Sequence, residues 1–257
     1  MSIITDPREI AQLREGGRRL AHILYLIEEA VSPGVRTDTL DQLAHQLIKK
    51  NGDTPSLLGY RPPFATRPYP STMCISVNDE IVHGVPSEHP IELKEGDIVG
   101  FDLVIGHNGL LTDSAITVPV GVVDKTARRL IEGTERALMA GISSARAGFK
   151  MGDIGHAIET VGQQYGFSVV EELCGHGVGR SVHEEPEVPN FGMPGKGVTL
   201  VPGMVLALEP MLNEGTKDIK LDNDGYTIRT KDGKRSAHFE HTILITEGDP
   251  EILTKRV

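Results

Sequence analysis

The sequence predicts an α+β protein made of two related halves within one domain, residues 1–257. Two observations carry this prediction. A pair of helical segments followed by short apolar strands occurs twice along the chain, and two segments of the chain resemble each other. The composition fits one globular domain, because 39% of the residues are hydrophobic and 24% are charged.

Helical periodicity predicts two helices at the start of the chain. The first runs from Pro7 to Ala30, with apolar side chains on one face and Thr5 or Asp6 as its cap. The second runs from Thr37 to Lys50 and ends at Asn51-Gly52.

A loop and the first strands follow. The ten residues from Arg61 to Pro70 contain four prolines, which are incompatible with a helix or a central strand, so we predict a loop there. Short apolar runs predict strands at Thr72–Val77, Ile98–Ile105 and Ala115–Val120.

The second half repeats this order. Two helices are predicted at Lys125–Ala147 and Met151–Tyr165, and strands are predicted at Met204–Leu212, Tyr226–Arg229 and Glu240–Thr246.

Two similar segments support an internal repeat. Lys94–Asp102 and Val201–Glu209 each place a carboxylate six residues after a turn glycine. A chance match of this length is easy, so the repeat and a coincidence are both open at this point.

The composition also excludes several classes of protein. A net charge of −10 argues against a nucleic-acid-binding surface, which needs a clustered basic face. Cys74 and Cys174 are too few for a disulfide framework or a cysteine-rich zinc module. The start of the chain does not resemble a signal peptide, and no apolar run is long enough to span a bilayer. We therefore expect a cytoplasmic protein without a nucleic-acid or membrane partner.

Two aspartates lie in a predicted hairpin, Gly100–Ser114. If its turn centres on His107-Asn108, Asp102 and Asp113 are directly opposite; if Asn108-Gly109 forms the turn, they are diagonal neighbours. Both registers put the two side chains on one face, within about 4.5–8 Å. Such a pair is destabilising unless a cation lies between the carboxylates, and a divalent metal ion fits. The alternative is that one aspartate caps a turn and the other is solvated.

A glycine-rich segment, Cys174–Pro186, presents two imidazoles. His176 and His183 are seven residues apart and could line the same cleft. Structural histidines are the alternative. A phosphate cradle is a poorer interpretation, because the segment has neither Gly-Lys-Ser/Thr nor the Rossmann spacing.

Two glutamates lie within largely apolar strand patterns. Glu209 and Glu240 could each face the solvent on an amphipathic strand. With the two aspartates, however, they supply four negative charges, and neutral His176 adds none. Two divalent cations would balance those charges, as in a buried dinuclear site.

Five segments, in this order, resemble the motifs of type 1 methionine aminopeptidases. They are Val77–Gly84, Gly100–Ser114, Gly175–Pro186, Pro202–Met211 and Ser236–Thr242. The resemblance covers nearly the whole chain. It implies the pita-bread fold of creatinase and aminopeptidase enzymes, with a curved antiparallel sheet, two pseudo-symmetric halves and outer helices. It also implies one catalytic domain that removes the N-terminal methionine from nascent proteins and peptides.

The resemblance implies a set of metal ligands. Asp102 resembles the chelating ligand of one metal ion, and Asp113 and Glu240 resemble the bridging carboxylates. His176 and Glu209 resemble the ligands that complete the second metal. In this family the two ions share a water or hydroxide that attacks the scissile carbonyl. Carboxylates with one imidazole suit Co, Mn, Fe(II) or Zn, and the residues do not choose among these.

The resemblance also implies substrate contacts. His83 and His183 resemble the two histidines that contact the scissile peptide, and Glu209 could move a proton to the departing amine. Tyr60 and Cys74 resemble residues of the pocket for the methionine side chain. For Cys74, a small buried hydrophobe is the alternative.

The chain departs from the family pattern near that pocket. Val182 stands where a Phe commonly precedes the second histidine, Tyr226 stands where many members have Trp, and the proline-rich stretch is longer than usual. These departures leave the strictness of methionine selectivity open. We expect small second residues to be preferred, as in Met-Ala and Met-Gly peptides.

The resemblance also implies further partners, and two alternative functions remain. The backbone around Asn78, Glu80 and Ser236 could hold a monovalent cation, the substrate could be a nascent chain at the ribosome, and the protein is expected to be a monomer. One rival is a proline-specific aminopeptidase or prolidase, although those usually carry a large N-terminal domain. Another is a non-catalytic binding protein with the same fold, although such proteins generally lose metal ligands.

Overall fold

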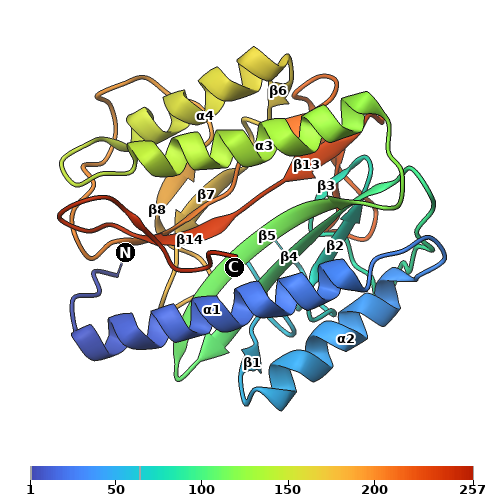
Figure 1. Ribbon diagram of the computed structural model, residues 1–257, viewed down its shortest axis with the longest axis horizontal. Coiled ribbons are helices and arrows are strands. Elements are labelled where there is room, and N and C mark those ends of the chain that lie inside the picture. The colour runs from blue at the N-terminus through green and yellow to red at the C-terminus, as the bar shows by residue number, and fades with distance from the viewer. Residues whose placement is uncertain (1, 64, 257) are drawn as a thin grey trace.

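The computed structural model describes residues 2–63 and 65–256. Its helices come in two pairs, one pair before each set of strands (Figure 1). Within the described residues they are α1 (Pro7–Glu29), α2 (Thr37–Lys50), α3 (Lys125–Ser144) and α4 (Met151–Tyr165). Both α2 and α4 have the predicted bounds.

The helix ends follow from local chemistry. An oxygen of Asp6 accepts a hydrogen bond from the backbone N–H of Arg8 at 2.8 Å, which confirms Asp6 as the cap of α1. Helix α3 is three residues shorter than predicted. Its backbone leaves the helical conformation at Ala145, where ψ is 62°, and Gly148 follows with φ of 85°.

The strands of the first half precede α3. They are β1 (Thr54–Pro55), β2 (Cys74–Val77), β3 (Glu80–Val82), β4 (Ile98–His107) and β5 (Leu110–Pro119). The antiparallel hairpin β4–β5 is the longest pairing, and β1 and β2 both pair with β4. The described part of the proline-rich stretch 61–70 is a loop, as predicted.

The strands of the second half are shorter. They are β6 (Ser168–Val169), β7 (Cys174–Gly177), β8 (Glu184–Pro189), β9 (Val205–Leu208), β10 (Met211–Asn213), β11 (Ile219–Leu221), β12 (Ile228–Thr230), β13 (Ser236–His238), β14 (His241–Leu244) and β15 (Glu251–Ile252). A five-stranded sheet has the order β15-β14-β9-β7-β8, and all its pairings are antiparallel.

Several strand predictions were incomplete. The predicted strand Met204–Leu212 is interrupted at Glu209-Pro210, where β9 ends and β10 begins. The predicted strand Ala115–Val120 is the second half of β5, which begins at Leu110. Strands β1, β3, β6, β7, β8, β11, β13 and β15 were not predicted, because each is short and gains its conformation from pairing with distant segments.

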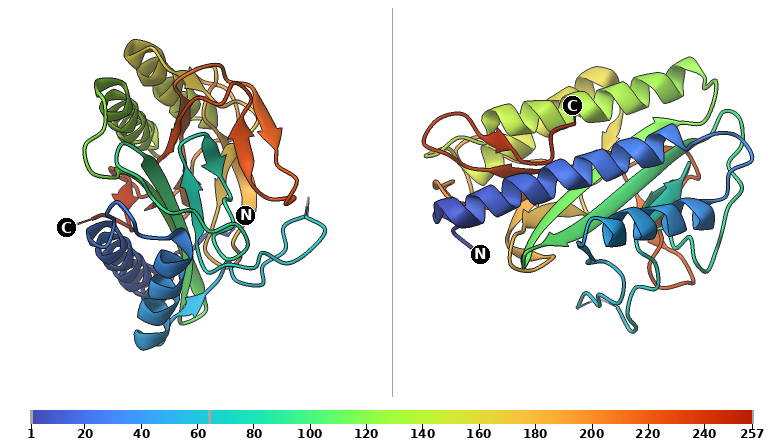
Figure 2. Two further views of the ribbon diagram at one scale, coloured as in Figure 1. Left: turned by 90° about the vertical axis from the view of Figure 1, so that its right-hand side faces the viewer. Right: turned by 60° about the horizontal axis from the view of Figure 1, so that its bottom comes forward.

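The two halves have the same local design. Gly96 precedes β4 and Gly203 precedes β9, and both have positive φ, 94° and 90°. Six residues after each glycine comes a carboxylate, Asp102 or Glu209. All four helices lie on one face of the strands, and the opposite face carries strands and loops (Figure 2). The main apolar core lies between these layers, around residues such as Phe101.

Hydrogen bonds join the two halves at one seam. The N–H of Glu240 donates to the carbonyl of Ala115 at 2.9 Å, and the N–H of His238 donates to the hydroxyl of Thr117 at 2.9 Å. The hydroxyl of Thr242 donates to the carbonyl of Asp113 at 2.7 Å. The seam therefore aligns β5 with residues 238–242, and both segments carry predicted metal ligands. In the described part of the chain, no helix is both long and apolar enough to cross a membrane.

Candidate metal centre and substrate cleft

A cleft of about 570 Å³ contains the candidate site. All nine predicted site residues line it. They are Tyr60, Cys74, His83, Asp102, Asp113, His176, His183, Glu209 and Glu240. The sequence-based set is therefore brought together by the fold, although it comes from segments up to 180 residues apart.

The hairpin takes the second of the two predicted registers. Asn108 and Gly109 form its two-residue turn with φ of 51° and 85°, as a type I′ turn requires. Asp102 pairs with Ala115 and Asp113 pairs with Val104. The two aspartates are thus diagonal neighbours on one face of the hairpin, as the second register predicts.

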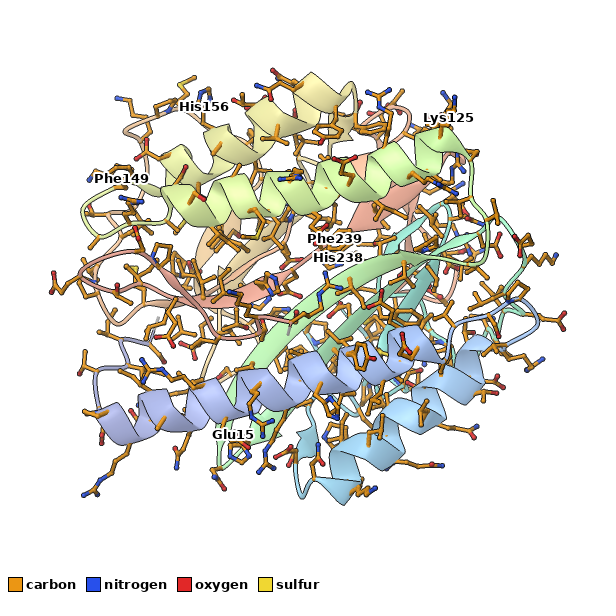
Figure 3. The ribbon with its side chains drawn as sticks, viewed as in Figure 1. Glu15, Lys125, Phe149, His156, His238 and Phe239 are labelled. Carbon is orange, nitrogen blue, oxygen red and sulfur yellow. The ribbon has the colours of Figure 1, made fainter. Side chains whose placement is uncertain are left out.

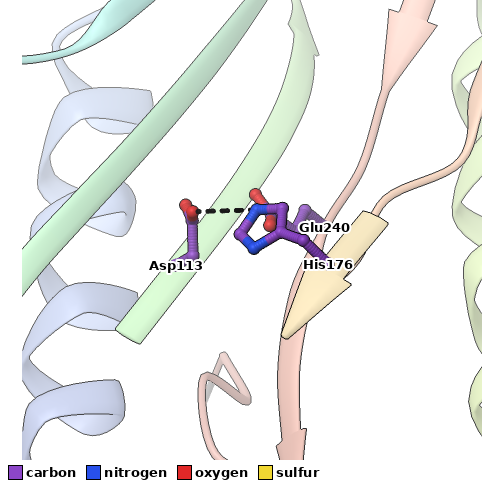
Figure 4. A group of neighbouring side chains, drawn as sticks. All are labelled: Asp113, His176 and Glu240. Atoms are coloured by element: carbon purple, nitrogen blue, oxygen red, sulfur yellow. Dashed lines mark ion pairs between the residues drawn. The ribbon is translucent and has the colours of Figure 1, made fainter. Parts of the chain in front are cut away.

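Three of the predicted ligands converge. Asp113, His176 and Glu240 each offer a ligand atom, and these atoms lie within 4.8 Å of one another (Figure 4). Nε2 of His176 is 3.7 Å from Oδ2 of Asp113 and 3.5 Å from Oε1 of Glu209. Glu209 therefore adjoins the group of three. Asp102 lines the same cleft, and its carboxyl group interacts with that of Asp113.

The carboxylates are buried without compensating donors. Oδ1 of Asp113 and Oε1 of Glu240 are buried and accept no hydrogen bond from any residue that the structure describes. Unpaired buried carboxylate oxygens are costly, and a cation is the usual remedy. Carboxylate oxygens together with one imidazole nitrogen form a donor set that suits a divalent transition metal.

The same burial shifts the pKa values of these acids upward. Burial raises the pKa of Asp102 to about 6 and that of Glu209 to about 8. Burial, followed by the charge of neighbouring carboxylates, raises the pKa values of Asp113 and Glu240 well above their ordinary range. A divalent cation would oppose all these shifts, because it favours the ionised form.

Strands β7 and β9 fix the position of His176. Backbone pairing places His176 opposite Ala207, and its Nδ1 contacts the carbonyl of Gly177 at 2.8 Å. A proton on Nδ1 would leave Nε2 as the free lone pair that faces the carboxylates. Burial lowers the pKa of His176 to about 3, so the ring is neutral and able to bind a metal ion.

The other two predicted histidines, His183 and His83, also line the cleft. His183 lies edge-to-face against His176 with ring centroids 4.4 Å apart, and its Nδ1 is 2.9 Å from the hydroxyl of Tyr60. His83 follows β3 in the left-handed region with φ of 61°, an uncommon conformation for a residue with a side chain. Burial lowers the pKa values of both rings, that of His83 to about 4.

An apolar pocket adjoins these histidines. Its walls form one cluster of largely buried side chains, which includes Leu57, Tyr60, Tyr69, Cys74, Val182 and Tyr226. Tyr69 and Tyr226 meet edge-to-face with centroids 5.1 Å apart, and the hydroxyl of Tyr69 donates to the carbonyl of Gly84 at 2.6 Å. Cys74 is 4% exposed, so the small-hydrophobe interpretation and the pocket interpretation are both compatible with its position.

One residue of the site was missed by sequence reasoning. His238 is 4% exposed, and its Nε2 lies 3.5 Å from Oε2 of Glu209. Burial lowers its pKa to about 4. The signal available in the sequence was its position two residues before Glu240, which puts both side chains on the same face of an extended segment.

Comparisons with known proteins place the chain among peptidases. Residues 11–247 match the sequence pattern of metallopeptidase family M24. A methionine aminopeptidase of Aquifex aeolicus is 45% identical over 250 residues, which cover 96% of each chain. Methionine aminopeptidase 1 of Bacillus subtilis is 44% identical over 255 residues, which cover 99% of this chain and 100% of the relative.

Solved structures agree with the sequence comparisons. The crystal structure of a methionine aminopeptidase from Thermotoga maritima matches with a TM-score of 0.93 and 40% identity, and 100% of both chains is covered. A prolidase from Pyrococcus furiosus matches with a TM-score of 0.75 and 22% identity, which covers 99% of this chain and 66% of the prolidase. The likeness to the prolidase shows the shared pita-bread fold alone.

Proposed function

Because the chain belongs to metallopeptidase family M24 and is therefore a metal-dependent hydrolase, we propose that it removes the N-terminal methionine from peptides. One observation carries the proposal. A cleft with an apolar pocket leads to Asp113, His176 and Glu240, whose ligand atoms lie within 4.8 Å of one another. The full-length relatives that are 44–45% identical are named methionine aminopeptidases, which supports the same activity for this chain.

The proposed metal site holds two divalent ions. Asp102, Asp113, His176, Glu209 and Glu240 would hold them, because two divalent cations balance four carboxylates and relieve the two orphaned oxygens. Co, Mn, Fe(II) and Zn all suit these donors. When bound, the metal supplies a nucleophilic water at neutral pH and polarises the scissile carbonyl. A monovalent cation near Asn78, Glu80 and Ser236 stays a prediction.

The residues of the cleft supply orientation and proton transfer. His83 and His183 are neutral, and each can donate one hydrogen bond to the scissile peptide group. Glu209 adjoins the ligand group, so its carboxylate could take a proton from the nucleophile and return it to the departing amine.

The apolar pocket would bind the methionine side chain. Tyr60 and Cys74 line the cleft beside Tyr69, Val182 and Tyr226, and a flexible thioether fills such irregular apolar space well. The preference for small second residues rests on the family resemblance and is part of the proposal. We also propose one catalytic domain over residues 1–257, a cytoplasmic location, a monomeric state and nascent chains at the ribosome as natural substrates.

A peptide panel tests this function. Metal-free protein is refilled with Mn²⁺, Co²⁺, Fe²⁺ or Zn²⁺ in turn, and hydrolysis of Met-Ala, Met-Gly, Met-Phe, Leu-Ala and Ala-Pro peptides is measured. We expect release of methionine from Met-Ala and Met-Gly peptides only. Equal hydrolysis of Met-Phe or Leu-Ala peptides would contradict the proposed selectivity, and preferential hydrolysis of Ala-Pro would favour a prolidase-like activity. Metal binding without hydrolysis of any peptide would favour a non-catalytic binding protein.

A further inference from the structure

The backbone of His238 is held from both directions. The hydroxyl of Thr117 accepts the N–H of His238 at 2.9 Å and donates to the carbonyl of His238 at 2.8 Å. On the other side, His238 pairs with Met211 in the β10–β13 ladder. These contacts come from both halves of the fold, and the side chain of His238 is buried.

The register carries His238 to the carboxylate of Glu209. Leu208 pairs with His241 and Met211 pairs with His238, so one antiparallel register continues across the interruption between β9 and β10. In this register Glu209 is opposite Glu240, and His238 is the diagonal neighbour of Glu209 on the same face. The observed distance of 3.5 Å between Nε2 of His238 and Oε2 of Glu209 agrees with that placement.

The carboxylate of Glu209 thus has an imidazole at each oxygen. Oε1 is 3.5 Å from Nε2 of His176, and Oε2 is 3.5 Å from Nε2 of His238. The two rings differ in one respect. His176 also lies 3.7 Å from Oδ2 of Asp113, whereas His238 has its one close carboxylate contact, within the described residues, with Glu209. This difference favours a supporting role over a ligand role for His238.

The Nε2 atom of His238 needs a partner. It is buried and has no hydrogen-bond partner in the part of the chain that the structure describes. An unsatisfied buried polar group costs about 1–3 kcal/mol, so the nearby Oε2 is its natural acceptor. Residues that hydrogen-bond a metal-binding carboxylate fix its orientation and strengthen metal binding.

We propose that His238 is a positioning residue, whose Nε2–H donates a hydrogen bond to Oε2 of Glu209 and thereby orients this carboxylate toward the metal. The role rests on the metal site proposed above. It concerns metal affinity, however, and so it can be tested separately from the peptide specificity of the enzyme.

Three substitutions test the role. His238→Gln keeps an N–H donor at a comparable distance from the backbone, His238→Met keeps much of the volume without a donor, and His156→Met changes a histidine on the exposed face of α4 (Figure 3). Each metal-free protein is titrated with Mn²⁺ by calorimetry, and its thermal unfolding is followed by circular dichroism. We expect roughly tenfold to hundredfold weaker Mn²⁺ binding for His238→Met. His238→Gln should stay within about threefold of the unsubstituted protein, as should His156→Met.

Two results would overturn the proposal. One is Mn²⁺ binding by His238→Met with unchanged affinity, which would leave the imidazole without a part in metal binding. The other is equal weakening in His238→Gln and His238→Met, which would indicate a ligand or a packing role. The Co²⁺-loaded forms distinguish a ligand role from a packing role. Loss of a nitrogen ligand changes the visible absorption bands, whereas a packing defect lowers the unfolding temperature. An unsubstituted protein that bound no metal would contradict the proposed function itself.

Discussion

The hydroxyl of Tyr60 lies 2.9 Å from Nδ1 of His183, across 123 residues of sequence. The ring of His183 is also packed edge-to-face against His176 at 4.4 Å. A hydroxyl that donates to Nδ1 leaves the proton of the neutral ring on Nε2. The two contacts together fix the orientation of His183, and the one from Tyr60 connects the start of the proline-rich loop to the site.

Replacing Tyr60 with Phe should slow catalysis without unfolding the protein. The substitution removes one hydrogen bond, and loss of a bond of this kind costs about 0.5–1.5 kcal/mol, or up to about tenfold in kcat/KM. Steady-state hydrolysis of a Met-Ala peptide measures the effect. Tyr25→Phe, at a tyrosine that is 46% exposed on α1, is the matched control. Unchanged kcat/KM in Tyr60→Phe would show that the hydroxyl does not orient His183.

Arg67 anchors the proline-rich loop against the pocket. Its guanidinium pairs with both oxygens of Glu88 at 2.6 Å and lies 5.4 Å from the ring centroid of Tyr226. The hydroxyl of Tyr226 in turn donates to the carbonyl of Arg67. An exposed ion pair contributes little to stability by itself, so the expected effect is on the pocket.

Arg67→Met should therefore raise KM for a Met-Ala peptide by roughly threefold to tenfold and leave kcat within about twofold, because ground-state binding is lost. Arg61→Met, at an exposed arginine of the same loop, controls for the change of charge. The comparison requires initial rates over a range of peptide concentrations. A fall in kcat with constant KM would instead indicate that the loop acts on the reacting groups.

Much of the fold could be predicted because periodicity is strong in the helices and in the central hairpin. Apolar spacing gave the bounds of α2 and α4, and the Asn108-Gly109 turn allowed the register that the structure has. Several of the short strands, such as β7 and β13, could not be predicted. A strand of three residues such as β13 has no measurable alternation, and its conformation depends on pairing with β10.

The residues of the site differ in the kind of reasoning that predicted them. The proximity of Asp102 and Asp113 on one face follows from the hairpin alone. The ligand role of Glu209, in contrast, required the family resemblance. Neither the strand pattern nor the family resemblance predicted His238. Its contact with Glu209 depends on a register that continues across the break between β9 and β10. The spacing of two residues from Glu240 indicates the face on which His238 lies, but not its contact with Glu209.

Asp113→Asn should abolish tight metal binding and yet stabilise the metal-free protein at pH 8. The buried carboxyl of Asp113 faces other carboxylates, and Asn has a similar shape without a charge to bury. We expect peptidase activity to fall at least about a hundredfold. The unfolding temperature of the metal-free form should rise by a few degrees, since about 1 kcal/mol corresponds to roughly 2–4 °C at this size.

Metal content and thermal unfolding, both measured after chelation and refilling, test this trade-off. Asp218→Asn makes the same change of charge at an exposed position and should alter neither quantity. If the metal-free form of Asp113→Asn were less stable than the unsubstituted protein at pH 8, the carboxylate would have to be compensated in some other way.

The metal-free protein should lose stability relative to Glu209→Gln as the pH rises from 6.5 to 8. Burial raises the pKa of Glu209 from 4.5 to about 8, so the folded state holds a proton that the unfolded state has already released. A group with a raised pKa stabilises the folded state below its unfolded pKa, and this stability is lost as the pH rises through the folded pKa. The buried histidines, whose pKa values are lowered, oppose this trend as the pH falls toward 6.5 and below, because the unfolded state then takes up protons that His176 and His83 cannot.

Within the window the histidines oppose the carboxylates, so the contribution of Glu209 is isolated by comparing the unsubstituted protein with Glu209→Gln. One retained proton over 1.5 pH units corresponds to about 2 kcal/mol of unfolding free energy, which urea unfolding of the chelated protein can resolve. Glu209→Gln should lack this loss, since it removes one of the titrating groups. Saturating Mn²⁺ should reverse the sign of the pH dependence, because metal binding requires the ligands to be deprotonated and stabilises the folded state more strongly at higher pH. The same pH dependence in the chelated unsubstituted protein and in Glu209→Gln would mean that Glu209 is already ionised at pH 6.5.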